Sequence, residues 1–133
     1  MTKKDHIQYW REESDKNWET AEYLLKGRQY IMALFMFHLV TEKLLKAVWV
    51  RDNVGDSPPR THDLQYLYNE TDLTLPTNFY DYLAVIGQWN TDSRYPDYRK
   101  KIYQVANDDY IRHHHQQVND LRLCLLNELS NPT

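Results

Sequence analysis

The sequence predicts an all-α protein, an antiparallel four-helix up-and-down bundle with one additional short helix. Apolar residues recur at three- and four-residue steps over long segments, which is the spacing of one helix face. Helix-breaking residues are few, with three Gly and five Pro, and no segment shows the apolar–polar alternation of a strand. With 133 residues the chain is expected to form one domain over residues 1–133.

Residues 29–52 are expected to form the central helix. Between residues 30 and 40 only His38 interrupts an apolar run, so this part is apolar nearly all round. From Glu42 onward the apolar residues narrow to a stripe, and the helix becomes amphipathic. A helix that is apolar all round lies inside a bundle or is covered by another chain. The run is shorter than the about 20 residues of a membrane span, so no membrane association is expected.

A first helix over residues 5–26 precedes the central one. Its apolar stripe ends at Gly27, a residue type that readily takes the left-handed conformation after the last turn of a helix. Because the link to residue 29 is very short, the first two helices are expected to be antiparallel neighbours.

The second half of the chain begins with a loop. Gly55, Pro58 and Pro59 exclude a helix after the central one. Thr61 is expected to cap a short helix that ends near Thr71.

Two longer helices follow in the second half. A fourth helix is expected to begin at Pro76 or Thr77, and Pro96 breaks the helical pattern after it. The last helix is expected to begin at residue 107 or 108 and to end at residues 131–132, with Asp108 and Asp109 complementing the dipole of its first turn.

Charge and cysteine content exclude several classes of protein. A formal net charge of -3 and a pI of about 6.0 argue against strong general nucleic-acid binding, which usually needs a basic face. The single Cys124 cannot form an intrachain disulfide and fits a reducing compartment. The first ten residues lack the apolar core of a signal peptide, so a cytoplasmic location is expected.

Five short motifs occur in an order and at spacings that resemble the HEPN domain, named for higher eukaryotes and prokaryotes nucleotide-binding. The motifs are Trp18 with Ala21-Glu22, Tyr30-Ile31-Met32-Ala33, Glu42-Lys43-Leu44-Leu45-Lys46-Ala47, Thr61-His62-Asp63-Leu64 and Arg94-Tyr95-Pro96-Asp97. The resemblance spans nearly the whole chain. It implies a helical bundle, a homodimer and association with a minimal nucleotidyltransferase encoded beside it. Some members are ribonucleases of toxin–antitoxin and defence systems.

The motif of those ribonucleases is absent. They carry an Arg followed by a polar residue, with a His five to seven positions after the Arg. No His lies five to seven positions after any of the Arg residues considered, which are Arg51, Arg60, Arg94, Arg99 and Arg112. Nuclease activity therefore does not follow from the resemblance, and the sequence leans against an enzyme.

The residues carried by the resemblance indicate a candidate ligand site. His62 can exchange a proton near neutral pH, Arg94 can pair with a phosphate and Tyr95 can stack on a base. Asp97 completes this loop motif. The other candidates are Glu42 and Lys46, expected nearby, and Arg99 and Lys100, which would attract an anion.

Each candidate also has a structural interpretation. Thr61 and His62 would cap and anchor a helix start, and an Arg94–Asp97 pair would lock its loop. Glu42 and Lys46, four residues apart, would form an ion pair within one helix, whereas the functional alternative has Glu42 bound to Arg94.

No metal or cofactor is expected. The consecutive residues His113, His114 and His115 fan out by about 100° each on a helix, so they cannot close on one metal ion. The chain also lacks a glycine-rich phosphate-binding loop.

Three functions remain open. The first is a dimeric HEPN-like binding module that binds a nucleotide or serves as accessory partner of a nucleotidyltransferase, of toxin–antitoxin or defence type. The second is an RNA-cleaving enzyme with a non-standard site that includes His62 and Arg94. The third is a purely structural protein-interaction adaptor.

Overall fold

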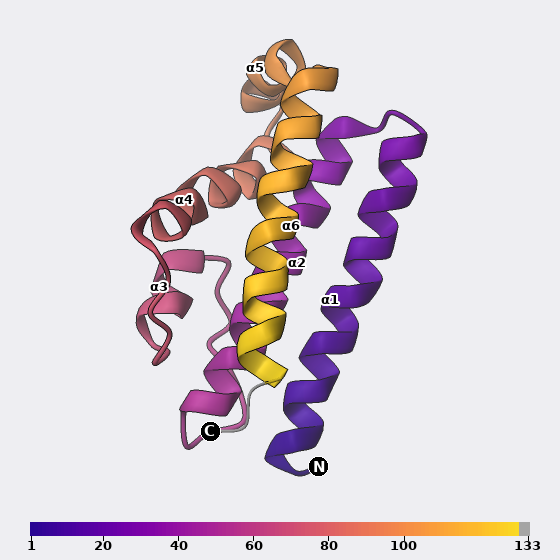
Figure 1. The fold of residues 1–133 in the computed structure, drawn as a ribbon. Helices are drawn as coiled ribbons and strands as arrows, with labels where there is room; N and C mark the ends of the chain where they lie inside the picture. The colour runs from indigo at the N-terminus through magenta and orange to yellow at the C-terminus, as the bar shows by residue number, and fades with distance from the viewer. Residues whose placement is uncertain (131–133) are drawn as a thin grey trace.

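The structure is a computed structural model that describes residues 1–130, without the side chains of residues 96–100. Over this described part the chain is all-helical and contains no strand, as the sequence predicts (Figure 1). Its helices are α1 (Lys3–Lys26), α2 (Tyr30–Asp52), α3 (Leu64–Asn69), α4 (Thr77–Asp92), α5 (Pro96–Val105) and α6 (Asp108–Ser130). No helix in this part is long and apolar enough to cross a membrane.

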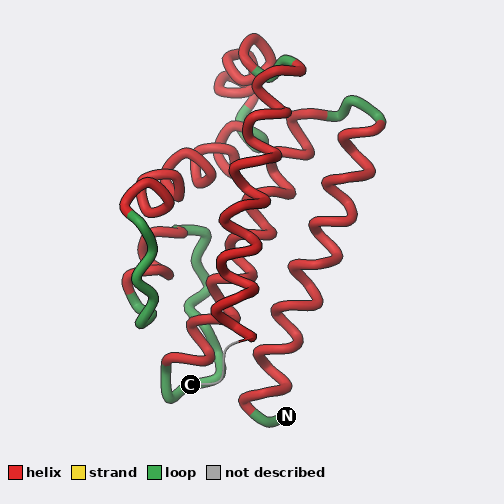
Figure 2. Tube along the Cα trace, in the orientation of Figure 1, coloured by secondary structure: helices red, strands yellow, loops and turns green. Residues whose placement is uncertain are grey.

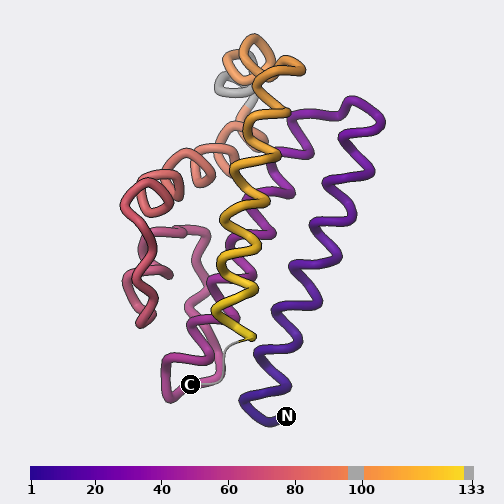
Figure 3. Tube along the Cα trace, viewed as in Figure 1, coloured from indigo at the N-terminus to yellow at the C-terminus, as the bar shows by residue number. Residues whose placement is uncertain are grey.

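The four long helices α1, α2, α4 and α6 alternate in direction along the chain, with α4 crossing obliquely (Figures 1 and 3). This arrangement is the predicted up-and-down bundle, and α3 is the predicted short helix. The helix α5 was not expected, because Pro96 reads as a break. Pro96 instead begins α5, at a position where the missing N–H costs no hydrogen bond within the helix.

The turn between α1 and α2 corrects one detail of the sequence analysis. The α1 helix ends at Lys26 as expected, but Gly27 has a φ of -87°, and the left-handed residue is Arg28, with a φ of 57°. The N–H of Gly27 still bonds the carbonyl of Tyr23, which continues the last turn. The chain therefore reverses one residue after the glycine, at a residue type that pays a steric penalty there.

Central α2 packs against each of the other five helices, but its two halves are buried to different degrees. From Val40 to Val50 every residue except Lys43 and Trp49 is buried. In the first half Met32 is 38% exposed, and Phe35 and Leu39 are only partly buried. The sequence left two alternatives for the apolar first half, burial inside the bundle or cover by another chain, and in the single chain this half is partly exposed.

Hydrogen bonds hold the C-terminal end of α2. The Lys3 ammonium, from the first turn of α1, donates to the carbonyls of Val50 and Asn53, each at 2.7 Å. The Arg51 guanidinium donates to the carbonyl of Glu128 at 3.0 Å, which ties α2 to the end of α6. Helix C-termini carry unpaired carbonyls and partial negative charge, so both cations stabilise this end of the bundle.

The loop after α2 runs back beside that helix and leads into α3 (Figure 2). The cap of α3 is Asp63, whose Oδ1 accepts the N–H of Tyr66 at 3.0 Å. The sequence analysis wrongly assigned this cap to Thr61. The Thr61 hydroxyl oxygen instead accepts a hydrogen bond from the N–H of Asp63, and this bond fixes the loop just before the helix cap.

Aromatic side chains join α4 to α6. The Tyr82 and His114 rings stack with an interplanar angle of 6°, and the Tyr82 hydroxyl lies 2.5 Å from His114 Nδ1. The Trp89 indole N–H donates a hydrogen bond to the hydroxyl of Tyr110. The Tyr110 ring also packs against the His114 ring. Burial lowers the pKa of His114 to about 4, so the ring is neutral. Its Nδ1 can therefore accept a hydrogen bond from the Tyr82 hydroxyl.

Candidate functional site

The candidate site is organised by the carboxylate of Glu42, in the middle of α2. Glu42 is only 4% exposed, and each of its oxygens has a partner. Oε1 lies 2.7 Å from His62 Nδ1, and Oε2 accepts from Lys46 Nζ at 3.1 Å. A buried carboxylate is stable only when paired and hydrogen-bonded, and these two contacts meet that requirement.

His38, one turn before Glu42 on α2, completes this Glu42 network. Burial lowers the pKa of the His38 ring, so the ring is neutral. Its Nε2–H donates a hydrogen bond to the carbonyl oxygen of His62, at 3.2 Å. His38 thus holds the backbone of His62 while Glu42 holds its side chain. Among the described residues, His38 Nδ1 has no hydrogen-bond partner.

Residues 38, 42 and 46 are each four apart, so they share one face of α2. The predicted Glu42–Lys46 ion pair is confirmed. The sequence analysis noted His38 only as an interruption of an apolar run. Its spacing of four residues before Glu42 is the signal that could have added it to the site.

The network determines which atom of His62 is offered to a ligand. An ionised carboxylate only accepts hydrogen bonds, so His62 Nδ1 carries the proton that is shared with Glu42. Nε2 is left as the outer ring nitrogen of a side chain that is 51% exposed. In the neutral ring Nε2 accepts a hydrogen bond or a proton, and in the protonated ring it donates to an anion.

His62 lines a groove between the start of α3 and the face of α4, with a volume of about 340 Å³. The other lining residues are Asp63, Leu64, Gln65, Leu83, Ala84, Gly87, Gln88, Asn90 and Thr91. Asn90 Oδ1 is buried and has no partner among the described residues. This oxygen is covered by protein atoms, so Asn90 can contact a ligand in the groove only through its other atoms.

Arg94 lies outside the Glu42 network. Its exposed guanidinium packs 5.7 Å from the centre of the Phe35 ring on α2, and Glu42 bonds to His62 and Lys46 rather than to Arg94. The alternative prediction, in which Glu42 binds Arg94, is therefore wrong. Tyr95 is exposed at the start of α5. The side chains of Asp97, Arg99 and Lys100 lie outside the described residues, as does any Arg94–Asp97 pair.

The three consecutive histidines have separate surroundings, as their helical spacing predicts. His113 is exposed, His114 joins the aromatic cluster with Tyr82, and His115 Nε2 lies 3.0 Å from a Glu22 oxygen. In the part of the chain that the structure describes, no three His, Cys, Asp or Glu side chains are placed to hold a metal ion.

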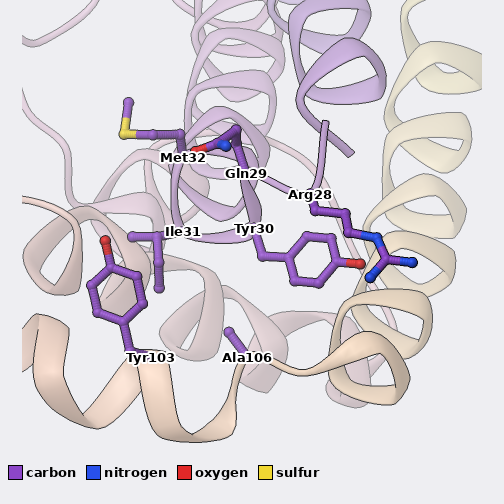
Figure 4. A pocket seen from close by; sticks show the side chains of 7 residues that line it. All are labelled: Arg28, Gln29, Tyr30, Ile31, Met32, Tyr103 and Ala106. Carbon is purple, nitrogen blue, oxygen red and sulfur yellow. The ribbon is translucent and has the colours of Figure 1, made fainter. Parts of the chain in front are cut away.

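A separate hollow of about 180 Å³ lies at the α1–α2 turn, away from the Glu42 network (Figure 4). The Arg28 and Tyr30 side chains extend in the same direction there, and Tyr103 reaches toward Ile31 from α5. The Tyr30 hydroxyl is hydrogen-bonded to Asp108. None of the residues that the sequence analysis singled out as ligand-binding lines this hollow.

Comparison with known proteins identifies the family of the chain. A search of the curated proteins and a search of the solved structures find no match. The family model of the HEPN domain matches residues 7–120, a range that includes the whole Glu42 network, Arg94 and the groove. The chain therefore belongs to the HEPN domain family.

Proposed function

We propose that this HEPN domain is a binding module that takes a nucleotide in the groove beside His62. The observation that carries the proposal is the 2.7 Å contact between His62 Nδ1 and the buried Glu42 carboxylate. This contact, together with the His38 bond to the His62 backbone, fixes the ring and leaves Nε2 available. A ligand group can then be bound without the entropic cost of ordering the histidine.

The groove supplies the two kinds of contact that a nucleotide needs. Gln65 and Gln88 line the groove and carry amide groups that can bond a base edge, although the Gln88 amide nitrogen already donates one hydrogen bond to Asp92 at 3.1 Å. His62, when protonated beside Glu42, suits a phosphate oxygen. We further propose that Arg94, near the end of α4, adds charge attraction for the phosphate.

We also propose that the module is a homodimer and an accessory partner of a minimal nucleotidyltransferase, of toxin–antitoxin or defence type. The half-exposed apolar residues of the first half of α2 support the dimer. Family membership alone supports the nucleotidyltransferase. Co-purification of the chain with the product of a neighbouring nucleotidyltransferase gene would test this partner.

One observation favours RNA cleavage as a second candidate function. A histidine oriented by a buried carboxylate is the arrangement that general-base catalysis uses, so His62 Nε2 could take the proton of a ribose hydroxyl. Cleavage also needs a cation at the reacting phosphate. No Lys or Arg lines the groove among the described residues, which favours binding over catalysis.

Calorimetric titration with a panel of nucleotides tests the binding proposal. We expect His62→Ala to weaken binding by about 1–3 kcal/mol, the usual loss for a charge-assisted hydrogen bond. Arg94 does not line the groove, so Arg94→Ala should weaken binding less, through the loss of charge attraction for the phosphate. Thermal melting of Arg94→Ala should stay near that of the parent, because its side chain is exposed. His113→Ala, which removes an exposed histidine of α6, is the matched control and should change neither quantity.

Incubation of the parent protein with mixed RNA separates the two functions. Intact RNA together with nucleotide binding supports the binding module. Cleavage that disappears in His62→Ala would establish the enzyme instead. A parent that binds no nucleotide and cleaves no RNA would leave the adaptor as the remaining function.

A further inference from the structure

We propose a second ligand site, beside Trp10, for a planar aromatic ligand that carries a negative group. A hollow of about 330 Å³ lies between the N-terminal part of α1 and the loop after α2. Tyr9 and Trp10 of α1, Lys46 of α2 and Arg60 of the loop all line it. None of these except Lys46 belongs to the Glu42 network.

The aromatic character of the site comes from two neighbouring rings. Tyr9 and Trp10 have ring centroids 5.2 Å apart with an interplanar angle of 79°. Tyr9 is 48% exposed, so a face or edge of its ring is open to a ligand. Offset-stacked and edge-to-face arrangements are both favourable between aromatic groups, and this wall can offer either to a planar ligand.

The positive charge of the site comes from Arg60. Lys46 also lines the hollow and its ammonium lies 5.4 Å from the centre of the Trp10 ring, but this ammonium is 3.1 Å from the Glu42 carboxylate, which balances its charge. Arg60 is exposed, and among the described residues its guanidinium forms no hydrogen bond or ion pair. The acidic lining residue, Asp56, is already paired with Lys3 at 3.0 Å. An unpaired cation in the same hollow as an exposed aromatic ring therefore favours a ligand that combines a ring with an anionic group.

This site is next to the His62 groove but has a different lining. Lys46 and His62 bind the two oxygens of the same Glu42 carboxylate, so that carboxylate separates the two hollows. Tyr9 and Arg60 do not line the groove, and Gln88 and Asn90 do not line the Trp10 site. Variants of Tyr9 and Arg60 therefore test this proposal without altering the groove.

Titration followed by NMR can identify the ligand chemistry. Phenyl phosphate carries both the ring and the charge, whereas inorganic phosphate carries only the charge and benzyl alcohol only the ring. We expect phenyl phosphate to shift the indole N–H signal of Trp10 and to bind at least about tenfold more tightly than either fragment. Titrations with adenosine 5′-monophosphate and with phosphotyrosine then compare the affinities of two natural ligands that combine a ring with a phosphate. Equal binding of phenyl phosphate and inorganic phosphate would overturn the proposal.

Matched variants locate the site. Tyr9→Leu should weaken phenyl phosphate binding by about tenfold, whereas Tyr9→Phe, which keeps the ring, should retain it. Arg60→Gln should weaken binding by a similar factor and reduce its dependence on salt. Tyr23→Leu removes an exposed tyrosine near the other end of α1 and should have no effect. Loss of binding in Tyr23→Leu, or full binding in both Tyr9→Leu and Arg60→Gln, would contradict the assignment.

Discussion

The two halves of α2 differ in a way that hydropathy alone does not predict. The first half is almost continuously apolar, yet it leaves Met32 exposed and Phe35 and Leu39 partly covered. The second half contains Glu42 and Lys46, yet it is nearly completely buried. Polar groups therefore lie in the interior where they meet each other, and apolar groups remain at the surface where the single chain has nothing to cover them.

The difference indicates separate roles for the two halves. In the second half, Glu42, Lys46 and His62 satisfy each other, and Lys3 and Arg51 close the helix end. This half positions the ligand site that we propose. The first half presents an apolar surface that suits contact with another chain.

Removing the Glu42 carboxylate should produce the largest effect. Glu42→Leu leaves the Lys46 ammonium buried without its partner, so we expect a loss of about 3–5 kcal/mol in the free energy of unfolding. The double variant Glu42→Leu/Lys46→Met should recover much of that loss, because no unpaired charge remains. Urea unfolding measures both.

A matched control for this variant exists on α1. Glu13 and Lys16 are also 3.1 Å apart but lie at the surface, so Glu13→Leu should change stability little. Equal melting of Glu42→Leu and the parent would show that the buried network does not stabilise the second half of α2.

Substitutions in the first half of α2 should act on self-association. We expect light scattering to give twice the 16.1 kDa mass of one chain at micromolar concentration. Met32→Glu places a charge in the apolar surface and should raise the dissociation constant of the dimer at least about tenfold. Leu123→Glu, on an exposed position of α6, is the control. A 16.1 kDa species at every concentration would remove the dimer from the proposed function.

Removing the hydrogen bonds at the C-terminal end of α2 should have a smaller effect on stability. Lys3→Met removes the ammonium that bonds the Val50 and Asn53 carbonyls, and we expect a loss of about 1 kcal/mol in stability. Lys4→Met changes the neighbouring exposed lysine and should be close to neutral. Thermal melts of the two variants compare them directly, and equal melting temperatures would contradict the capping role.

The last predicted effect depends on pH. The pKa of His114 is lowered to about 4 in the folded chain from an ordinary value of 6.5, so between these values the unfolded chain binds the extra proton. Stability should therefore fall as the pH decreases from about 6.5 to 4. His114→Gln, which keeps an acceptor but does not titrate, should reduce the slope of melting temperature against pH. An unchanged slope would mean that other groups cause the acid sensitivity.

The sequence predicted those parts of the fold that depend on local signals. Gly27 marked the end of α1, Asp108 opened α6, and the four-residue spacing of Glu42 and Lys46 predicted their ion pair. It failed where one residue type permits two outcomes. Pro96 can end one helix or begin another, and the left-handed turn could fall on either Gly27 or Arg28.

The site could be predicted only in part, because its geometry depends on contacts between distant segments. The resemblance selected Glu42, Lys46 and His62, which the structure brings together. The role of His38 and the burial of Glu42 require the loop after α2 to fold back on that helix. No periodicity within α2 reports that contact. The hollow beside Trp10 likewise joins α1 to a loop some fifty residues later in the chain.

The bond between Lys3 and the end of α2 also bears on the order in which the chain folds. Lys3 and its partners Val50, Asn53 and Asp56 all lie in the first 56 residues, so the α1–α2 hairpin can close completely before α6 is synthesised. The contacts beside the α1–α2 turn have short sequence separation and should form first, and the Lys3 bonds, which span 47 and 50 residues, should then close the hairpin on which later helices dock. Pulsed hydrogen exchange should accordingly show protection of α1 and α2 amides before those of α6. Simultaneous protection of all three helices would instead mean that the hairpin is not stable alone.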